Sequence, residues 1–128
     1  MSIKVLVVED QSFNLLLMRL LMERAGHRVL TAKTAEEGME IARRETPDLI
    51  LMDVTLPGMS GLEATRLLKS EPRTRGICIV GLSAHALKGD AERALIAGCD
   101  GYVTKPIDTR TLPEYLTGLL ERFRGRGE

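Results

Sequence analysis

Short, continuous runs of mostly apolar residues recur along this chain and alternate with longer segments in which apolar residues have helical spacing. The runs are four to six residues long and rich in Val, Ile and Leu. Runs of this kind are typical of strands buried on both faces of a sheet. They predict strands over residues 3–8, 28–32, 48–53, 77–82 and 101–104.

The segments between these runs carry helix signals. Gly26 follows the first segment and suits a helix C-terminus, while Ser12 or Asp10 stands where an N-cap belongs. Thr34 and Glu37 have the spacing of a capping box at the start of the second segment. Together with the periodic leucines, these signals predict helices over residues 13–25, 34–45, 61–70, 87–97 and 109–123.

Strand and helix therefore alternate along the whole chain, which predicts an α/β fold. Alternation with continuous apolar strands implies a parallel sheet that is covered by helices on both faces. A length of 128 residues suits a single domain of this kind. In such sheets ligands bind at the carboxyl ends of the strands, so polar residues just after each strand are the first candidates for a site.

Composition excludes several function classes. Lys plus Arg and Asp plus Glu each total 18, so the chain lacks the basic excess of a duplex-binding protein. Aromatic residues make up 3%, too few for a base-stacking platform. No apolar run approaches the ~20 residues that cross a membrane, and the N-terminus lacks the features of a signal peptide, so we expect a cytoplasmic protein. Cys78 and Cys99 are expected to be small buried hydrophobic residues rather than a disulfide.

Polar side chains stand at the ends of four predicted strands: Glu9 and Asp10, Asp53, Ser83, and Lys105. Taken singly, each suits a helix cap, a strand end, a turn or a loop. Their shared place favours a site, because neighbouring carboxylates repel unless a hard cation such as Mg²⁺ lies among them. Cation, ammonium and hydroxyl together can hold a phosphoryl group. Asp53 is the best candidate for a nucleophile that forms an acyl phosphate, with Glu9 and Asp10 holding the metal.

At this point four stretches resemble the receiver domain of two-component response regulators. They are VLVVED (5–10), DLILMDVTLPGMSGLE (48–63), IVGLSA (79–84) and GYVTKP (101–106). The order and spacing of the stretches match as well as their residues. The resemblance implies a flavodoxin-like, doubly wound, five-stranded parallel (βα)5 sheet of strand order 2-1-3-4-5.

The resemblance also assigns roles to individual residues. It implies that Asp53 is the phosphoacceptor and that Lys105 pairs with the phosphoryl group. It makes Asp10 and Asp53 direct Mg²⁺ ligands, adds the backbone carbonyl of Thr55, and has Glu9 act through a water.

Four positions are implied to control the response rather than the transfer. Ser83 matches the switch hydroxyl that turns toward the phosphate, and Tyr102 matches the aromatic position that swings inward with it. A half-exposed strand residue remains the plainer interpretation of Tyr102. Thr55 and His85 occupy the variable positions that tune dephosphorylation.

The resemblance runs from Ile3 to about Leu120 and implies one receiver domain over residues 1–124, with 125–128 as a short flexible tail. We therefore expect a stand-alone response regulator that accepts its phosphoryl group from a histidine kinase or a histidine phosphotransfer protein. Its output would be a downstream protein bound to the face of the fourth helix, fifth strand and last helix, without direct nucleic-acid or membrane binding. It would not be an enzyme beyond its own phosphorylation and dephosphorylation at Asp53.

Two alternatives stay open from the sequence. One is a binding module of the same fold that works without phosphorylation, against which the intact acidic set and Lys105 count. The other is a haloacid-dehalogenase-type phosphatase, which also uses an Asp nucleophile but needs a second acid two residues later. Thr55 stands at that place.

Overall fold

The computed structural model describes residues 2–83 and 89–126 and contains a single five-stranded parallel sheet. The strand order is β2-β1-β3-β4-β5, the flavodoxin-like order expected from the sequence. In chain order the elements are β1 (Lys4–Val8), α1 (Ser12–Arg24), β2 (Arg28–Ala32), α2 (Ala35–Glu45), β3 (Leu49–Asp53), α3 (Gly61–Ser70), β4 (Cys78–Ser83), α4 (Asp90–Ala97), β5 (Gly101–Thr104) and α5 (Leu112–Arg126). All five predicted strands are confirmed to within one residue at each end.

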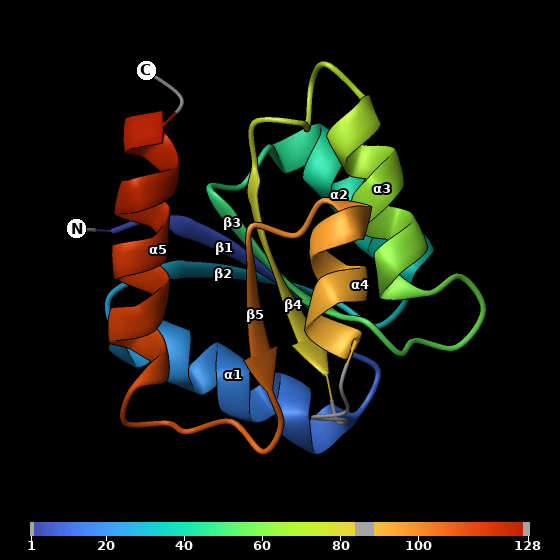
Figure 1. The fold of residues 1–128 in the computed structure, drawn as a ribbon. Coiled ribbons are helices and arrows are strands. Elements are labelled where there is room, and N and C mark those ends of the chain that lie inside the picture. Colours follow the sequence, from blue (N-terminus) through green and yellow to red (C-terminus); the bar gives the residue numbers. More distant parts are fainter. Residues whose placement is uncertain (1, 84–88, 127–128) are drawn as a thin grey trace.

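The sheet separates two hydrophobic layers (Figure 1). Helices α1 and α5 cover one face, and α2, α3 and α4 cover the other. Successive side chains of a strand point to opposite faces, so Leu6 and Val8 of β1 pack under α2 while Val5 and Val7 pack under α1. This two-sided burial explains the continuous apolar runs in the sequence.

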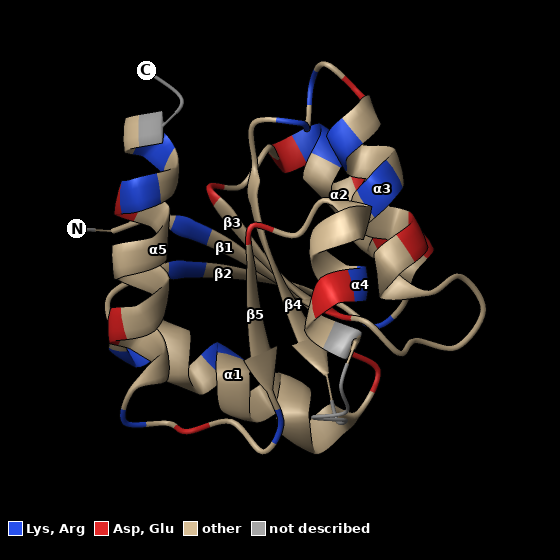
Figure 2. Cartoon of the chain, viewed as in Figure 1, with Lys and Arg blue, Asp and Glu red and all other residues tan. Residues whose placement is uncertain are grey.

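Charged residues lie outside these layers. In Figure 2 the strands are largely tan, and the Lys, Arg, Asp and Glu residues lie on helices, loops and strand ends. Cys78 and Cys99 are buried and not disulfide-bonded, as expected of small hydrophobic residues. Within residues 2–83 and 89–126, no helix has both the length and the apolar character needed to cross a membrane.

The start of α1 differs from the prediction. The N-cap is Gln11, whose side chain makes no capping hydrogen bond, rather than Ser12 or Asp10. Ser12 is the first helical residue, and its hydroxyl accepts a hydrogen bond from Lys33 Nζ at 3.3 Å. The capping box of α2 is confirmed in part: Thr34 Oγ1 accepts from Glu37 N at 3.1 Å, but the Glu37 carboxylate accepts from the neighbouring Lys33 N.

The last helix also begins and ends later than predicted, at Leu112 and Arg126 instead of 109 and 123. Asp108 accounts for the late start, because its carboxylate accepts a hydrogen bond from Arg110 N at 3.0 Å. A side chain that bonds the backbone two residues later stabilises a turn in place of the first helical turn. Helix α4 begins at Asp90 in the described part of the chain, and residues 87 and 88 of the predicted 87–97 helix lie outside it.

His27, which precedes β2, provides a test of this packing by pH. Its Nδ1 accepts a hydrogen bond from Ile3 N at 3.3 Å, and burial holds the pKa of the imidazole below its ordinary value. The neutral form therefore stabilises the folded chain at a pH above about 6.5, and this contribution is lost as the pH falls below that value. Loss of one such hydrogen bond costs about 0.5–1.5 kcal/mol.

We expect the stability advantage of the wild type over His27→Asn, which keeps an acceptor that does not titrate, to shrink between pH 7.5 and 5.5. Urea unfolding at several pH values measures this difference. A difference that stays constant with pH would contradict the assigned role of the imidazole.

Candidate functional site

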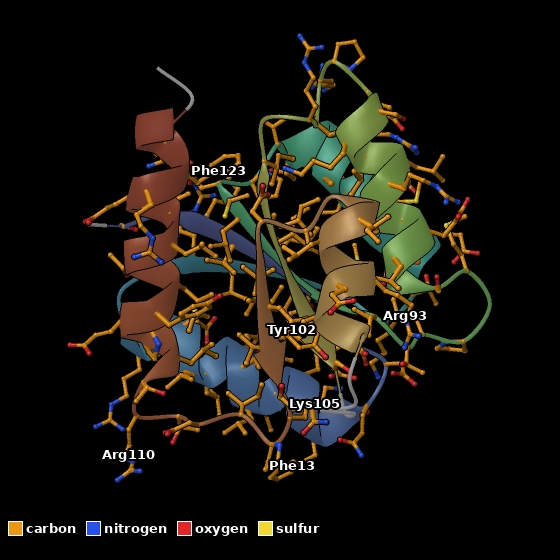
Figure 3. The ribbon with its side chains drawn as sticks, in the orientation of Figure 1. Phe13, Arg93, Tyr102, Lys105, Arg110 and Phe123 are labelled. Carbon is orange, nitrogen blue, oxygen red and sulfur yellow. The ribbon has the colours of Figure 1, made fainter. Side chains whose placement is uncertain are left out.

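The predicted site residues converge at the carboxyl edge of the sheet. Val8 pairs with Met52, Asp53 with Leu82, and Ser83 with Thr104, so the ends of β1, β3, β4 and β5 are successive neighbours. Glu9 and Asp10 follow β1, Asp53 ends β3, Ser83 ends β4, and Lys105 follows β5. Figure 3 shows Lys105 just beyond the end of β5.

Three carboxylates lie together at this edge. Glu9, Asp10 and Asp53 each offer one oxygen, and these oxygens all lie within 4.8 Å of one another. Glu9 and Asp53 are buried, whereas Asp10 is exposed. The cluster is therefore open to solvent on the side of Asp10 and closed behind by the strands.

Lys105 supplies the positive charge of the cluster. Its Nζ lies 2.6 Å from Glu9 Oε1 and 3.0 Å from Asp53 Oδ2. Burial alone would lower the pKa of this ammonium, but its contacts with the carboxylates of Glu9 and Asp53 outweigh burial and leave the pKa above the ordinary value. Lys105 therefore remains charged and offsets part of the negative charge of the cluster.

Glu9 has the least favourable environment of the three acids. Burial raises its pKa to about 7, because the lowering effect of Lys105 does not offset burial and the nearby charge of Asp53. One oxygen, Oε2, accepts a hydrogen bond from Gln11 N at 3.2 Å. The other, Oε1, is buried and contacts Lys105 as an ion pair, but it accepts no well-aligned hydrogen bond from the described residues.

These donors fit a hard divalent cation. Mg²⁺ prefers carboxylate and carbonyl oxygens and keeps several waters, and the cluster offers carboxylate oxygens with access to solvent. A cation here would offset the negative charge that Lys105 does not neutralise. It would also attract Glu9 Oε1, which accepts no well-aligned hydrogen bond from the described residues. Asp10, Asp53 and Glu9 are the residues whose side chains could hold it.

The backbone around Asp53 fixes the direction of its carboxylate. Asp53 Oδ1 accepts a hydrogen bond from Thr55 N at 2.9 Å, and Oδ2 accepts from Lys105 Nζ. Gly61, the first residue of α3, packs against the same strand end, and a β-carbon there would overlap the backbone carbonyl oxygen of Asp53. Gly61 N also donates to Val54 O at 3.2 Å. Only glycine lets α3 approach the end of β3 this closely.

The remaining predicted residues come from the end of β4, the loop after β3 and the interior of β5. Ser83 is buried at the end of β4, and Thr55 is exposed on the loop after β3. Tyr102 is half-buried within β5 and packs against the layer under α3 and α4 (Figure 3). His85 lies outside the described residues.

Two features of the site region were missed from the sequence. One is Gly61, for which the only signal was a glycine at the start of a helix after a Pro-Gly loop. The other is the exposed side of α1, where Phe13 is 70% exposed and Leu16 and Leu20 about half. The sequence signal for this exposed side was the large number of apolar residues in the helix, because a helix this short cannot bury all of them on one face.

We expect Mg²⁺ to raise the thermal midpoint of the protein, because a ligand that binds only the folded chain stabilises it by about 1.4 kcal/mol at ten times its Kd. For a domain of this size that corresponds to roughly 3–6 °C. Asp10→Asn should remove most of this shift and should stabilise the metal-free protein, since it lowers like-charge repulsion.

Asp108→Asn is the matched control, because Asp108 is exposed on the β5–α5 loop outside the cluster and should leave the Mg²⁺ response unchanged. Scanning calorimetry with Mg²⁺ and with EDTA measures each variant. An unchanged Mg²⁺ shift in Asp10→Asn would rule out the cluster as the cation site.

Comparisons with known proteins agree with this geometry. A family model described as the response regulator receiver domain matches residues 5–117. The polar-differentiation response regulator DivK of Brucella ovis is 40% identical over 120 residues, which cover 91% of this chain and 98% of that protein. DivK of Brucella anthropi is 40% identical over 116 residues, covering 88% of this chain and 94% of that protein.

Solved structures show the same fold. A response regulator structure from Chloroflexus aurantiacus superposes with a TM-score of 0.90 at 25% identity, covering 94% of this chain and 99% of that one. The receiver domain of the sensor histidine kinase PA1611 from Pseudomonas aeruginosa has a TM-score of 0.86 at 31% identity, with coverage of 94% and 99%. That domain holds a magnesium ion coordinated in its active-site cleft. The sequence match and the shared fold together show that this chain belongs to the response regulator receiver domain family and to two-component signalling.

Proposed function

We propose that this protein accepts a phosphoryl group on the carboxylate of Asp53 from a phosphohistidine of a histidine kinase or histidine phosphotransfer protein. The observation that carries the proposal is the setting of Asp53. It is buried at the end of β3, its oxygens are held by Thr55 N and Lys105 Nζ, and two further carboxylates lie beside it. A nucleophile held this way is oriented before its substrate arrives.

Each site residue has a role in this proposal. Asp10 and Asp53 would hold Mg²⁺ with their side chains, the backbone carbonyl of Thr55 would add a third oxygen, and Glu9 would act through a water. When bound, the metal offsets negative charge on the phosphoryl oxygens. Lys105, already within 3.0 Å of Asp53, pairs with the same oxygens.

The transfer itself is a displacement at phosphorus. A carboxylate oxygen of Asp53 forms the new O–P bond while the P–N bond of the phosphohistidine breaks, and the electron pair of that bond returns to the imidazole. The reaction is confined to the protein's own Asp53 and turns over no separate substrate. Thr55, exposed at the mouth of the site, and His85 tune the access of water that later hydrolyses the acyl phosphate.

The exposed side of α1 suits the phosphodonor. Phe13 follows Asp10 by three residues, and Leu16 and Leu20 continue its exposed stripe along the helix. Beside Leu20 a groove of about 570 Å³ runs between α1 and the start of α5 and includes Arg24 and Arg110. An apolar stripe at the mouth of a buried site offers a partner a surface that brings its phosphohistidine to Asp53.

The surface around α4 and β5 suits the output. Leu95 and Ile96 of α4 are 58% and 85% exposed, and Tyr102 of β5 packs against the core layer under that helix. In the proposed switch Ser83 turns toward the new phosphate and Tyr102 follows it inward. The face of α4, β5 and α5 then binds a downstream protein in a phosphorylation-dependent way.

Asp53→Asn should abolish labelling by phosphoramidate in Mg²⁺, because an amide cannot form the acyl phosphate. Intact-mass measurement detects the modification, and Asp108→Asn should label as the wild type does. Labelling that survives in Asp53→Asn would remove Asp53 as the acceptor. Equal binding of a downstream protein by wild type and Asp53→Asn, with or without donor, would favour the phosphorylation-independent binding module instead.

The role of α1 is tested by comparing two kinds of donor. The double variant Phe13→Ala, Leu20→Ala should slow transfer from a phosphorylated histidine kinase about tenfold and leave labelling by phosphoramidate unchanged, since a small donor needs no docking surface. Ile96→Ala, an exposed apolar truncation on α4, should leave both rates unchanged. Equal slowing with both donors would show that the variant damages the site rather than docking.

A further inference from the structure

The hydroxyl of Tyr115 lies against the main chain of Tyr102. Tyr102 N donates a hydrogen bond to Tyr115 Oη at 3.3 Å, and Tyr115 Oη lies 3.5 Å from Tyr102 O, to which it donates. A hydroxyl can accept one hydrogen bond and donate another at the same time. A side chain of α5 thus contacts both main-chain groups of one residue in β5.

These main-chain groups face the outer edge of the sheet. Strand β5 is last in the strand order and has β4 on one side only in the described part of the chain. Lys105 N bonds to Ser83 O toward β4, and alternate residues of a parallel strand direct their N–H and C=O to the same side. Tyr102, an odd number of positions from Lys105, therefore directs its groups away from β4, where Tyr115 meets them.

The glycine before Tyr102 lets α5 come this close. A β-carbon at Gly101 would overlap Leu119 Cδ2 and would lie 2.8 Å from Tyr115 Oη. Tyr115 and Leu119 are one helical turn apart, so both occupy the space that a side chain at 101 would need. The hydroxyl contact and the absence of a side chain at 101 are separate observations that point to one docking position for α5.

Apart from this hydrogen-bonded contact, β5 and the start of α5 are less closely packed. A cavity of about 190 Å³ lies beside Tyr102 and Tyr115 and extends to Thr104, Pro106 and Thr111. Tyr115 itself is 37% exposed. In the described part of the chain, the hydrogen bonds of Tyr115 join α5 to β5.

We infer that Tyr115 is a positioning residue that fastens α5 to the main chain of Tyr102, so that a movement of β5 at Tyr102 is carried to α5. The second half of this inference rests on the proposed function, in which phosphorylation moves Tyr102. The first half, the attachment itself, does not.

Tyr115→Phe tests the attachment, because it keeps the ring and removes only the hydroxyl. The amide of Tyr102 should exchange its hydrogen about five-fold faster by NMR, as expected on loss of one hydrogen bond. Thr117→Val is the matched control, because the Thr117 hydroxyl bonds to Pro113 O within α5 and its loss should leave the Tyr102 amide unchanged. An unchanged exchange rate in Tyr115→Phe would overturn the inference.

The coupling is tested with beryllofluoride and Mg²⁺, which imitate the phosphoryl group. In the wild type we expect chemical-shift changes both around Asp53 and at amides 115–119, and in Tyr115→Phe the changes at 115–119 should fall by at least about half while those around Asp53 persist. Gly101→Ala, which pushes α5 away, should have the same effect, whereas Gly76→Ala adds a β-carbon in open space and should not.

Equal changes at 115–119 in wild type and Tyr115→Phe would overturn the coupling. A wild type that shows no change around Asp53 would contradict the proposed function, and the exchange rate of the Tyr102 amide would still decide the attachment.

Discussion

The contact of the Lys105 ammonium with the buried carboxylates of Glu9 and Asp53 is the interaction on which the rest of the site depends. Two buried carboxylates side by side carry a large desolvation and repulsion cost unless a cation accompanies them. The three groups come from the ends of β1, β3 and β5, so the ammonium after β5 reaches two strands that are not neighbours of β5. The same contact leaves the cluster short of positive charge, which makes it receptive to a metal.

The parallel sheet is what allows these groups to meet. All strands end at the same edge, and the central strands β1, β3 and β4 are apolar on both faces along their interiors, so their polar side chains lie where the strands start or stop. Loops that follow the strands then hold the polar groups in place. Gly61 shows how closely this is controlled, since α3 begins against the backbone of Asp53 itself.

The strands and the position of the acidic cluster at their carboxyl ends could be predicted from the sequence. Both follow from local patterns, namely continuous apolar runs and the polar residues that end them. Features that depend on contacts between residues far apart in the chain could not be predicted from the sequence. The late start of α5 is set by the Asp108 turn, and the exposure of Phe13 depends on how α1 is rotated on the sheet. The contact of Tyr115 with Tyr102 joins two segments whose closeness only the folded chain reveals.

The division of the core into two layers has a consequence for how this protein can evolve. Helices α1 and α4 pack on opposite faces of the sheet and have no core residues in common. A substitution under one helix therefore leaves the packing of the other intact, and surface changes on the two helices are close to additive. In the proposed function, the α1 surface for an upstream partner and the α4 surface for a downstream partner can therefore diverge separately, while α5 borders both the groove beside α1 and the output face and constrains the two together.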